Sequence, residues 1–336
     1  MSYPTLRLHP RKEESVLRFH PWVFSGAIAS YSAPVQDGDL VSVVDSKGRP
    51  LGTGHFGGGS IAVRLLSFDP EEAIDRVFYK RRLEAALRLR LSCDLVRPVG
   101  SCECPNTTYR LVHGEGDSLP GLIIDIYDRT AVVQAHSLGM HQARQTIAEV
   151  LWEVYTEAGD PVEPLQGVYY KSETTLPTRD MRELASDGFL IGHTEAAPIY
   201  ENGVRFTPDW LKGQKTGFFI DQRDNRELVG HYAKDRTVLN AFCYTGCFSI
   251  YALQAGAKRV DSLDSSAKAM YLTEQHVALN FGAECPRHRS VTEDAFDYLE
   301  RMPEGEYDLI ILDPPAFAKH RKVLRNALMG YRKINS

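Results

Sequence analysis

The sequence predicts a multidomain α/β protein whose last part forms a doubly wound parallel sheet. Strand and helix patterns alternate there, with strands expected at 238–242, 260–264 and 308–313 and helices at 248–255 and 266–280. Such alternation is typical of a parallel sheet covered by helices. The first 69 residues carry short β-like runs separated by glycine- and aspartate-containing turns, which predict a small β-barrel. The segment between these parts mixes both patterns and predicts a central α+β unit.

Length and composition fit this division. For a chain of 336 residues, at roughly 150 residues per domain, two or three domains are expected, and the changes of pattern place them at 1–69, 70–197 and 198–336. The 39 basic and 44 acidic residues give a net charge of −5, which argues against a surface that is basic throughout but allows local basic patches for nucleic acid. No apolar segment approaches the roughly 18 residues that span a bilayer, the N-terminus has no signal-peptide pattern, and six irregularly placed cysteines give no disulfide framework. We therefore expect a reduced, cytoplasmic protein without membrane association.

The first candidate site is the segment 240–246, which leaves a predicted strand and enters a predicted helix. Ligands of open α/β sheets bind beyond the carboxyl ends of the strands, where a glycine such as Gly246 allows close approach of the backbone. Asp264 closes the next strand, and its two carboxylate oxygens can accept both hydroxyls of a ribose. The segment lacks the Gly-x-Gly-x-x-Gly pattern of pyrophosphate sites, so an adenosine ligand without phosphates, S-adenosylmethionine, fits better. A purely structural glycine turn is the alternative.

Two further segments are candidates for the same ligand. A short strand is expected to end near 291–294, between those at 260–264 and 308–313. Asp294 at its end can accept from the amino group of an adenine or cap the helix expected at 295–301, and the two roles are compatible. Gln222 belongs to the polar and aromatic segment 212–226, just before the first strand of the sheet. Together with the Phe218–Phe219 pair it is expected to line the cofactor pocket; a loop that only links two domains is the alternative.

The most specific motif is Asp313-Pro314-Pro315-Ala316-Phe317, at the end of the last predicted strand. Two consecutive prolines fix an extended turn and remove two backbone donors. The carbonyls near Asp313 and Pro314 are then available to accept from a planar base, on which Phe317 can stack. A Pro-Pro turn with a purely structural purpose is the alternative.

Taken together, these residues resemble the ribosomal RNA large-subunit methyltransferase family that makes 5-methylcytosine with S-adenosylmethionine. The resemblance spans nearly the whole chain in the family's order, and the matching segments are 20–26 (His-Pro-Trp-Val-Phe-Ser-Gly), 114–122, 213–226, 240–246, 313–317 and 330–335. It implies an RNA-binding PUA domain at 1–69, a central α+β domain at 70–197, and a Rossmann-like class I methyltransferase domain at 198–336.

The resemblance also implies roles for the candidate residues. Asp313 would position the edge of the cytosine, and Pro314, Pro315 and Phe317 would contact the base. The residues expected to bind S-adenosylmethionine are Gln222, Asn240, Phe242, Tyr244, Gly246, Asp264, Asp294 and Asp313. Large-subunit ribosomal RNA is the implied partner, and the oligomeric state is left open, a homodimer included.

In this family the nucleophile is a cysteine. Its thiolate adds to C6 of cytosine, C5 takes the methyl group, and a base then removes the C5 proton. The resemblance places this cysteine in a Ser-Cys-Ser-like motif on the strand after the one ending at Asp313, and none of the six cysteines matches it. We therefore expect a methyltransferase domain truncated at its C-terminus, without its last strands and the nucleophile. Cys243 and Cys247 are expected to pack beside the cofactor turn, and no zinc site is expected among the cysteines of segment 93–104.

Two other functions stay open. Asp-Pro-Pro-Phe-like turns also serve exocyclic amines, so methylation of a guanine or adenine nitrogen in ribosomal RNA is the second enzymatic hypothesis. A non-catalytic RNA-binding protein with a vestigial cofactor fold is the third hypothesis, from another class.

Basic residues gather in two places. The helix expected from residue 74 onward carries six bases against the single acid Glu84, and this face is either an RNA-facing stripe or an ordinary solvated face; the bases are Arg76, Lys80, Arg81, Arg82, Arg88 and Arg90. The segment 316–336 has six bases and no acid, and it is expected to form a second basic patch for RNA.

Overall fold

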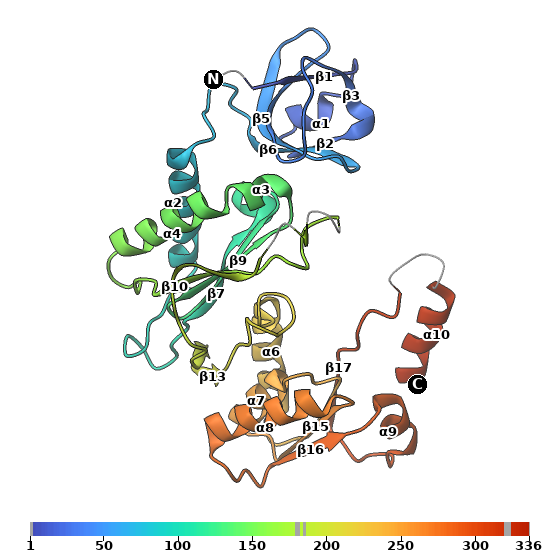
Figure 1. Cartoon of the computed structure of the whole chain (residues 1–336). Coiled ribbons are helices and arrows are strands. Elements are labelled where there is room, and N and C mark those ends of the chain that lie inside the picture. The colour runs from blue at the N-terminus through green and yellow to red at the C-terminus, as the bar shows by residue number, and fades with distance from the viewer. Residues whose placement is uncertain (1–2, 179–181, 184–185, 319–323, 336) are drawn as a thin grey trace. The chain divides into compact units, whose positions relative to one another are not determined.

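The computed structural model describes residues 3–178, 182–183, 186–318 and 324–335, and its chain separates into two compact units (Figure 1). The first consists of Met1–Ile199 and Pro208–Phe218, and the second of Tyr200–Thr207 and Phe219–Ser336. The three-domain boundaries given above stay a prediction. Within the described residues, no helix has the length and apolar character needed to cross a membrane. Lys319, Arg321 and Lys322 of the expected C-terminal basic patch lie outside the described residues.

The first unit begins with a sheet of six short strands in the order β2-β6-β5-β4-β1-β3. Their bounds are β1 Thr5–Leu8, β2 Trp22–Phe24, β3 Ile28–Tyr31, β4 Leu40–Val44, β5 Pro50–Phe56 and β6 Ile61–Ser67, with the short helices α1 Glu14–Leu17 and η1 Ser25–Ala27. Neighbouring strands are antiparallel except β1 and β4. Alternate residues, such as Val41 and Val43 on β4, face one core, because successive side chains of a strand point to opposite faces. The predicted module of short strands is confirmed.

The second sheet of this unit has the order β11-β10-β9-β8-β7. Its strands are β7 Thr108–His113, β8 Leu122–Tyr127, β9 Thr130–Ala135, β10 Gly167–Tyr170 and β11 Gly188–Gly192, and its helices are α2 Arg76–Ser92, η2 Gly114–Asp117, α3 Leu138–Gln142 and α4 Arg144–Glu157. Apolar side chains of α2 and α4, among them Phe78, Leu83, Leu151 and Val154, share one core with the sheet. Residue 143 is the C-cap of α3 and directly precedes α4, so these two helices follow each other without a loop.

The basic face of α2 is neutralised by acids of this unit. Lys80 Nζ lies 2.8 Å from Glu157 Oε2 and also bonds Glu153 of α4. Arg90 forms a two-bond pair with the carboxylate of Asp117. The remaining pairs of this face are Arg76 with Glu149 and Glu153, Arg81 and Arg82 with Glu72, and Arg88 with Glu84. This pairing favours the structural interpretation of the basic face over an RNA-facing stripe.

The second unit contains a parallel sheet with the strand order β16-β15-β14-β17. The strands are β14 Thr237–Ala241, β15 Arg259–Asp264, β16 His288–Thr292 and β17 Leu309–Leu312. They alternate with helices, as the sequence predicts; the helices are η3 Ile220–Gln222, α6 Arg223–Ala233, α7 Cys247–Gln254, α8 Ala267–Phe281, α9 Ala295–Arg301 and α10 Leu324–Ile334. Strands β12 Ile199–Glu201 and β13 Val204–Phe206 form a separate two-stranded sheet.

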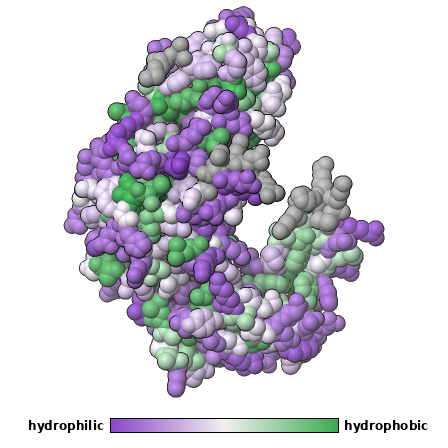
Figure 2. All heavy atoms as spheres, in the orientation of Figure 1, coloured by the Kyte–Doolittle hydropathy of each residue, from purple (hydrophilic) through white to green (hydrophobic). Residues whose placement is uncertain are grey.

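The register of the parallel sheet brings the candidate residues to one edge. Ala241 at the end of β14 pairs with Leu263 of β15 on one side and with Leu312 of β17 on the other. The segments that follow these strands therefore leave the sheet side by side. Strand β17 lies at the end of the strand order, and its Ile310 is exposed. Hydrophobic residues also gather over helix α10 on the face drawn in Figure 2.

Candidate cofactor site

The turn between β14 and α7 has an unusual backbone. Phe242 and Tyr244 have φ angles of 58° and 50°, and Gly246 has a φ of 72°. Non-glycine residues rarely adopt this left-handed region, at a cost of roughly 1–2 kcal/mol each, and such residues are typical of functional sites. A Cβ atom at Gly246 would lie 2.4 Å from Cγ2 of Thr273 on α8, so the turn needs glycine there for space as well as for its backbone angle.

Asp264, at the end of β15, holds this turn in place. Its Oδ2 accepts from the backbone N–H of Tyr244 at 3.0 Å, and its Oδ1 accepts from the N–H of Ser266 at 2.9 Å, just before α8. A carboxylate offers about four acceptor positions, so these two bonds leave capacity for a ligand. The predicted juxtaposition of Asp264 with the turn through Gly246 is present, whereas the two backbone hydrogen bonds were not foreseen.

Asp294 occupies the same edge, one strand further along. It follows β16, which pairs with β15 as expected. Its Oδ1 accepts from the N–H groups of Phe296 at 2.8 Å and Asp297 at 3.3 Å, so it is the N-cap of α9. The capping role is confirmed, and the proposed contact with adenine stays a prediction.

Gln222 and Phe219 come from the segment before β14. The ring of Phe219 makes an edge contact with that of Tyr244 at 5.5 Å between centroids, which sets this segment beside the turn. Gln222 precedes α6, and its Oε1 accepts from Nδ2 of Asn225 at 2.8 Å. Phe218, which the sequence groups with Phe219 as a pocket-lining pair, is buried and belongs to the first unit.

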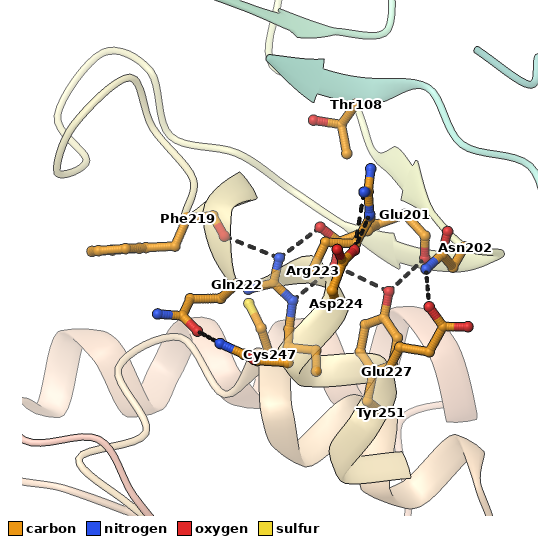
Figure 3. Close-up of polar contacts among 12 residues, drawn as sticks. Thr108, Glu201, Asn202, Phe219, Gln222, Arg223, Asp224, Glu227, Cys247 and Tyr251 are labelled. Atoms are coloured by element: carbon orange, nitrogen blue, oxygen red, sulfur yellow. Dashed lines mark hydrogen bonds and ion pairs between the residues drawn. The ribbon is translucent and has the colours of Figure 1, made fainter. Parts of the chain in front are cut away.

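A buried ionic cluster, which the sequence patterns did not reveal, fixes this segment (Figure 3). Arg226 of α6 donates from Nε to Glu201 Oε1 at 2.8 Å and from Nη2 to Glu201 Oε2 at 2.6 Å. The same Nη2 donates to the carbonyl oxygen of Phe219 at 3.0 Å. Tyr251 of α7 donates to Glu201 Oε1 at 3.0 Å. The cluster thus joins β12, α6 and α7 and holds the backbone of Phe219 next to the turn.

The side chain of Asn240 points into the sheet layer. Its Nδ2 donates to Oγ of Ser249 on α7 at 2.9 Å, and Ser249 bonds Oγ of Ser262 on β15 at 2.6 Å. Ser262 in turn lies 2.8 Å from Nε2 of His288 on β16. The first two bonds are buried, so Asn240 is part of a polar chain across the sheet, and its predicted contact with the cofactor stays a prediction.

The Asp-Pro-Pro loop leaves β17 beside the turn after β14. Asp313 is exposed, directly after the strand. Phe317 contacts the ring of Phe296 on α9 at 5.8 Å and that of Tyr331 on α10 at 4.6 Å between centroids. Phe242 joins the same row through Phe296 at 6.2 Å. Asp313, Pro314, Pro315 and Phe317 are thus brought to the edge that carries the cofactor candidates, although Phe317 already has two aromatic neighbours.

The cysteines of this region are packed thiols. Sγ of Cys243 lies 3.6 Å from Sδ of Met270. Burial raises the pKa of the Cys243 thiol, and it raises the pKa of the Cys247 thiol to about 11. Both thiols stay protonated at neutral pH, in line with the packing role expected for them. No cluster of three or more metal-ligating side chains occurs in the part of the chain that the structure describes.

Two segments of the chain match models of known protein families. Residues 6–68 match the model of a PUA-like domain, and residues 176–335 match that of an S-adenosylmethionine-dependent methyltransferase. These matches confirm the predicted PUA-like and methyltransferase domains and the predicted cofactor.

Curated relatives match nearly the whole chain. Ribosomal RNA large subunit methyltransferase I of Alteromonas mediterranea is 38% identical over 334 residues, which cover 98% of this chain and 79% of the relative. The protein of the same name from Shewanella denitrificans is 39% identical over 337 residues, covering 98% and 80%. A crystallised protein from Streptococcus mutans, described as a candidate S-adenosylmethionine-dependent methyltransferase, superposes with a TM-score of 0.75 at 25% identity, covering 98% of this chain and 82% of its own. The chain therefore belongs to the ribosomal RNA large subunit methyltransferase I family of S-adenosylmethionine-dependent methyltransferases.

Proposed function

We propose that this protein transfers the methyl group of S-adenosylmethionine to C5 of a cytosine in large-subunit ribosomal RNA, in the cytoplasm. The name of its relatives supports ribosomal RNA as the substrate, and the PUA-like domain supports binding of RNA. The observation that carries the proposal is the single sheet edge that brings together Asp264, the turn through Gly246 and the Asp313-Pro314-Pro315 loop.

The groups at this edge fit an adenosine-containing cofactor. We assign the ribose hydroxyls to Asp264 and the adenine amino group to Asp294, because both carboxylates follow neighbouring parallel strands. Phe242, Tyr244 and Gly246 supply backbone groups in a turn that lacks a pyrophosphate pattern. Asn240, at the end of β14, and Gln222, before α6, complete the set of residues assigned to the cofactor. The cofactor, when bound, supplies an electrophilic methyl group.

The target base is assigned to the loop after β17. Asp313 is proposed to accept from the edge of the cytosine, with Pro314, Pro315 and Phe317 against its face. The nucleophilic thiolate of the C5 reaction is not assigned to Cys243 or Cys247, because a raised pKa keeps a thiol protonated and unreactive.

The proposal is tested by incubating the protein with ribosomal RNA that lacks base methylation and with S-adenosylmethionine carrying a labelled methyl group. Digestion to nucleosides then shows which base carries the label. Label in 5-methylcytosine is the expected result. Label on a guanine or adenine nitrogen would establish the second enzymatic hypothesis instead, and failure of the protein to bind the cofactor would leave only RNA binding.

Replacing Asp264 by alanine is expected to raise the Kd of S-adenosylmethionine about tenfold to a hundredfold. The reason is that a hydrogen bond to a charged group contributes about 1.5–3 kcal/mol, and this carboxylate also holds the backbone of Tyr244. Isothermal titration calorimetry measures the change.

Asp308→Ala is the matched control. Asp308 Oδ2 accepts from the backbone N–H of Thr237 at 2.8 Å, at the opposite end of β14. The Asp308→Ala variant loses the same kind of carboxylate–backbone bond, but away from the candidate site. Its affinity for S-adenosylmethionine should therefore stay within about twofold of that of the unchanged protein. Equal affinities of the two variants would remove Asp264 from the site.

A further inference from the structure

The first unit contains a pocket that is built by residues of its PUA-like and central sheets. Its volume is about 580 Å³, within the range of roughly 300–1,000 Å³ that is common for ligand-binding pockets. Strand β6 contributes Arg64, β8 contributes Leu122 and Ile123, and the loop after β10 contributes Lys171. Glu115 of η2 is the acid of this lining.

Two cations of this pocket form no direct ion pair with a described residue, although Glu115 attracts Arg64, and Asp209 and Asp187 attract Lys171, at longer range. Neither Arg64 nor Lys171 forms an ion pair with any residue that the structure describes, in contrast to the basic residues of α2. Lys171 is 8% exposed, and its Nζ donates to the carbonyl oxygen of Gly213 at 2.8 Å. An ammonium has three donors, so this bond leaves two for a ligand. Burial lowers the pKa of Lys171, which indicates a cation that an anionic ligand would stabilise.

Two motifs for which the cofactor site gives no role meet here: the segment 114–122 lines the pocket, and the segment 20–26 is bonded to it. Trp22, in the segment 20–26, donates from Nε1 to Oε1 of Glu115, in the segment 114–122, at 2.7 Å. The second segment is anchored by Asp117, which pairs with Arg90 and accepts from the N–H of His113 at 2.6 Å. The segment 114–122, which lines the pocket, is thus held in place by the segment 20–26 and by α2.

A glycine shapes one wall of the pocket. Gly121 has a φ of 83°, and a Cβ atom at this position would lie 2.9 Å from Oγ of Ser137, so the 114–122 segment needs glycine there to pass beside Ser137. Ile123, two residues further on, is partly exposed and supplies an apolar side chain to the pocket lining, whereas Leu122 points to the opposite face of β8 and into the core.

We propose that this pocket binds one nucleotide of the RNA substrate, with its phosphate between Arg64 and Lys171 and its base against Ile123. The inference rests on the proposed function, since it takes RNA as the substrate. A phosphodiester supplies the direct ionic contact that neither cation makes within the described residues, and the apolar side chain of Ile123 suits the face of a base. Because the segment 114–122 lines the pocket and Trp22 of the segment 20–26 bonds its Glu115, the inference also gives these motifs a shared purpose.

The test measures binding of a short, fluorescently labelled single-stranded RNA by anisotropy at several salt concentrations. Arg64→Gln is expected to weaken binding about tenfold and to reduce the log–log salt slope by about 0.7, the value for one phosphate on a single strand. Lys171→Gln should weaken binding in the same way. Arg64→Lys should retain most of the affinity, because a lysine still supplies a point charge to a phosphate.

Arg88→Gln is the matched control, since it removes one positive charge from the same unit at a residue that is exposed and paired with Glu84. Its RNA affinity and salt slope should stay near those of the unchanged protein. Equal losses in Arg64→Gln and Arg88→Gln would overturn the pocket while leaving RNA as the substrate. No RNA binding by the unchanged protein would overturn both. The same assay can be run with an acidic polyglutamate peptide. If binding of the peptide requires Arg64 and binding of RNA does not, the pocket serves a protein partner, and the inference is overturned.

Discussion

Replacing Arg226 by methionine is expected to lower the free energy of unfolding of the second unit by about 3–5 kcal/mol, because the variant leaves the carboxylate of Glu201 buried without a countercharge. The side chains of Arg226 and Glu201 are 2% and 0% exposed. Water therefore cannot solvate the orphaned carboxylate, and the Tyr251 hydroxyl is the remaining hydrogen-bond donor to it within the cluster of Figure 3.

The loss should extend to the cofactor. Arg226 also donates to the carbonyl oxygen of Phe219, whose ring lies against Tyr244. Without this bond the segment before α6 is less firmly held beside the turn, so the affinity for S-adenosylmethionine should fall as well. Arg226 is a positioning residue in this proposal, because it acts through the backbone of Phe219.

Hydrogen exchange of peptides from β14 and α7 measures the stability of the second unit. Tryptophan fluorescence does not serve here, because all three tryptophans lie in the first unit. Arg301→Met is the control, since Arg301 forms an exposed pair with Glu293 in the same unit, and such pairs contribute about 0–1 kcal/mol. Combining Glu201→Leu with Arg226→Met should recover part of the loss, because replacing both members of a buried pair by apolar groups is often tolerated. Equal exchange rates in the Arg226 and Arg301 variants would contradict the role given to the cluster.

The sequence predicts the edge of the parallel sheet well, because that part of the site depends on local patterns. Apolar runs followed by Asp264 or by Asp313 mark strand ends directly, and parallel pairing then brings these ends together. The Glu201–Arg226 pair depends instead on the meeting of elements that are 25 residues apart. Neither residue stands in a periodic pattern, so only the folded chain reveals the pair.

Side-chain direction and charge neutralisation are the other properties that local patterns miss. The sequence places Asn240 near the glycine turn but does not reveal that its amide nitrogen donates to Ser249 of α7, and its contact with the cofactor stays a prediction. The bases of α2 formed a stripe in the sequence, yet acids of α4, more than 70 residues away, neutralise Arg76 and Lys80. In both cases the deciding partner comes from another element, which a window of sequence does not contain.

Acidification is expected to destabilise the first unit through His55, a buried residue of β5. Burial, with a further contribution from Arg64, lowers the pKa of this imidazole to about 4, against about 6.5 for an unfolded chain. Above pH 6.5 this histidine is neutral in both the folded and the unfolded chain, so its lowered pKa does not reduce the free energy of unfolding there. Between about 6.5 and 4 the unfolded chain binds a proton that the folded chain does not, so stability falls as the pH falls and the loss levels off below 4. The difference between the two pKa values corresponds to a total loss of about 3 kcal/mol.

Urea unfolding followed by tryptophan fluorescence measures this dependence in the first unit. Ten other histidines also titrate, so the informative quantity is the difference in pH dependence between the unchanged protein and a His55→Gln variant. The variant is less stable at pH 7, because glutamine replaces a ring that packs against Gly139 of α3. It has no imidazole to protonate, so its stability should decline less between pH 7 and pH 4.5, and the gap between the two proteins should narrow by about 2–3 kcal/mol over that interval. Parallel curves for the two proteins would mean that His55 takes up its proton in the folded state as easily as in the unfolded chain, which a residue 6% exposed and close to Arg64 should not do.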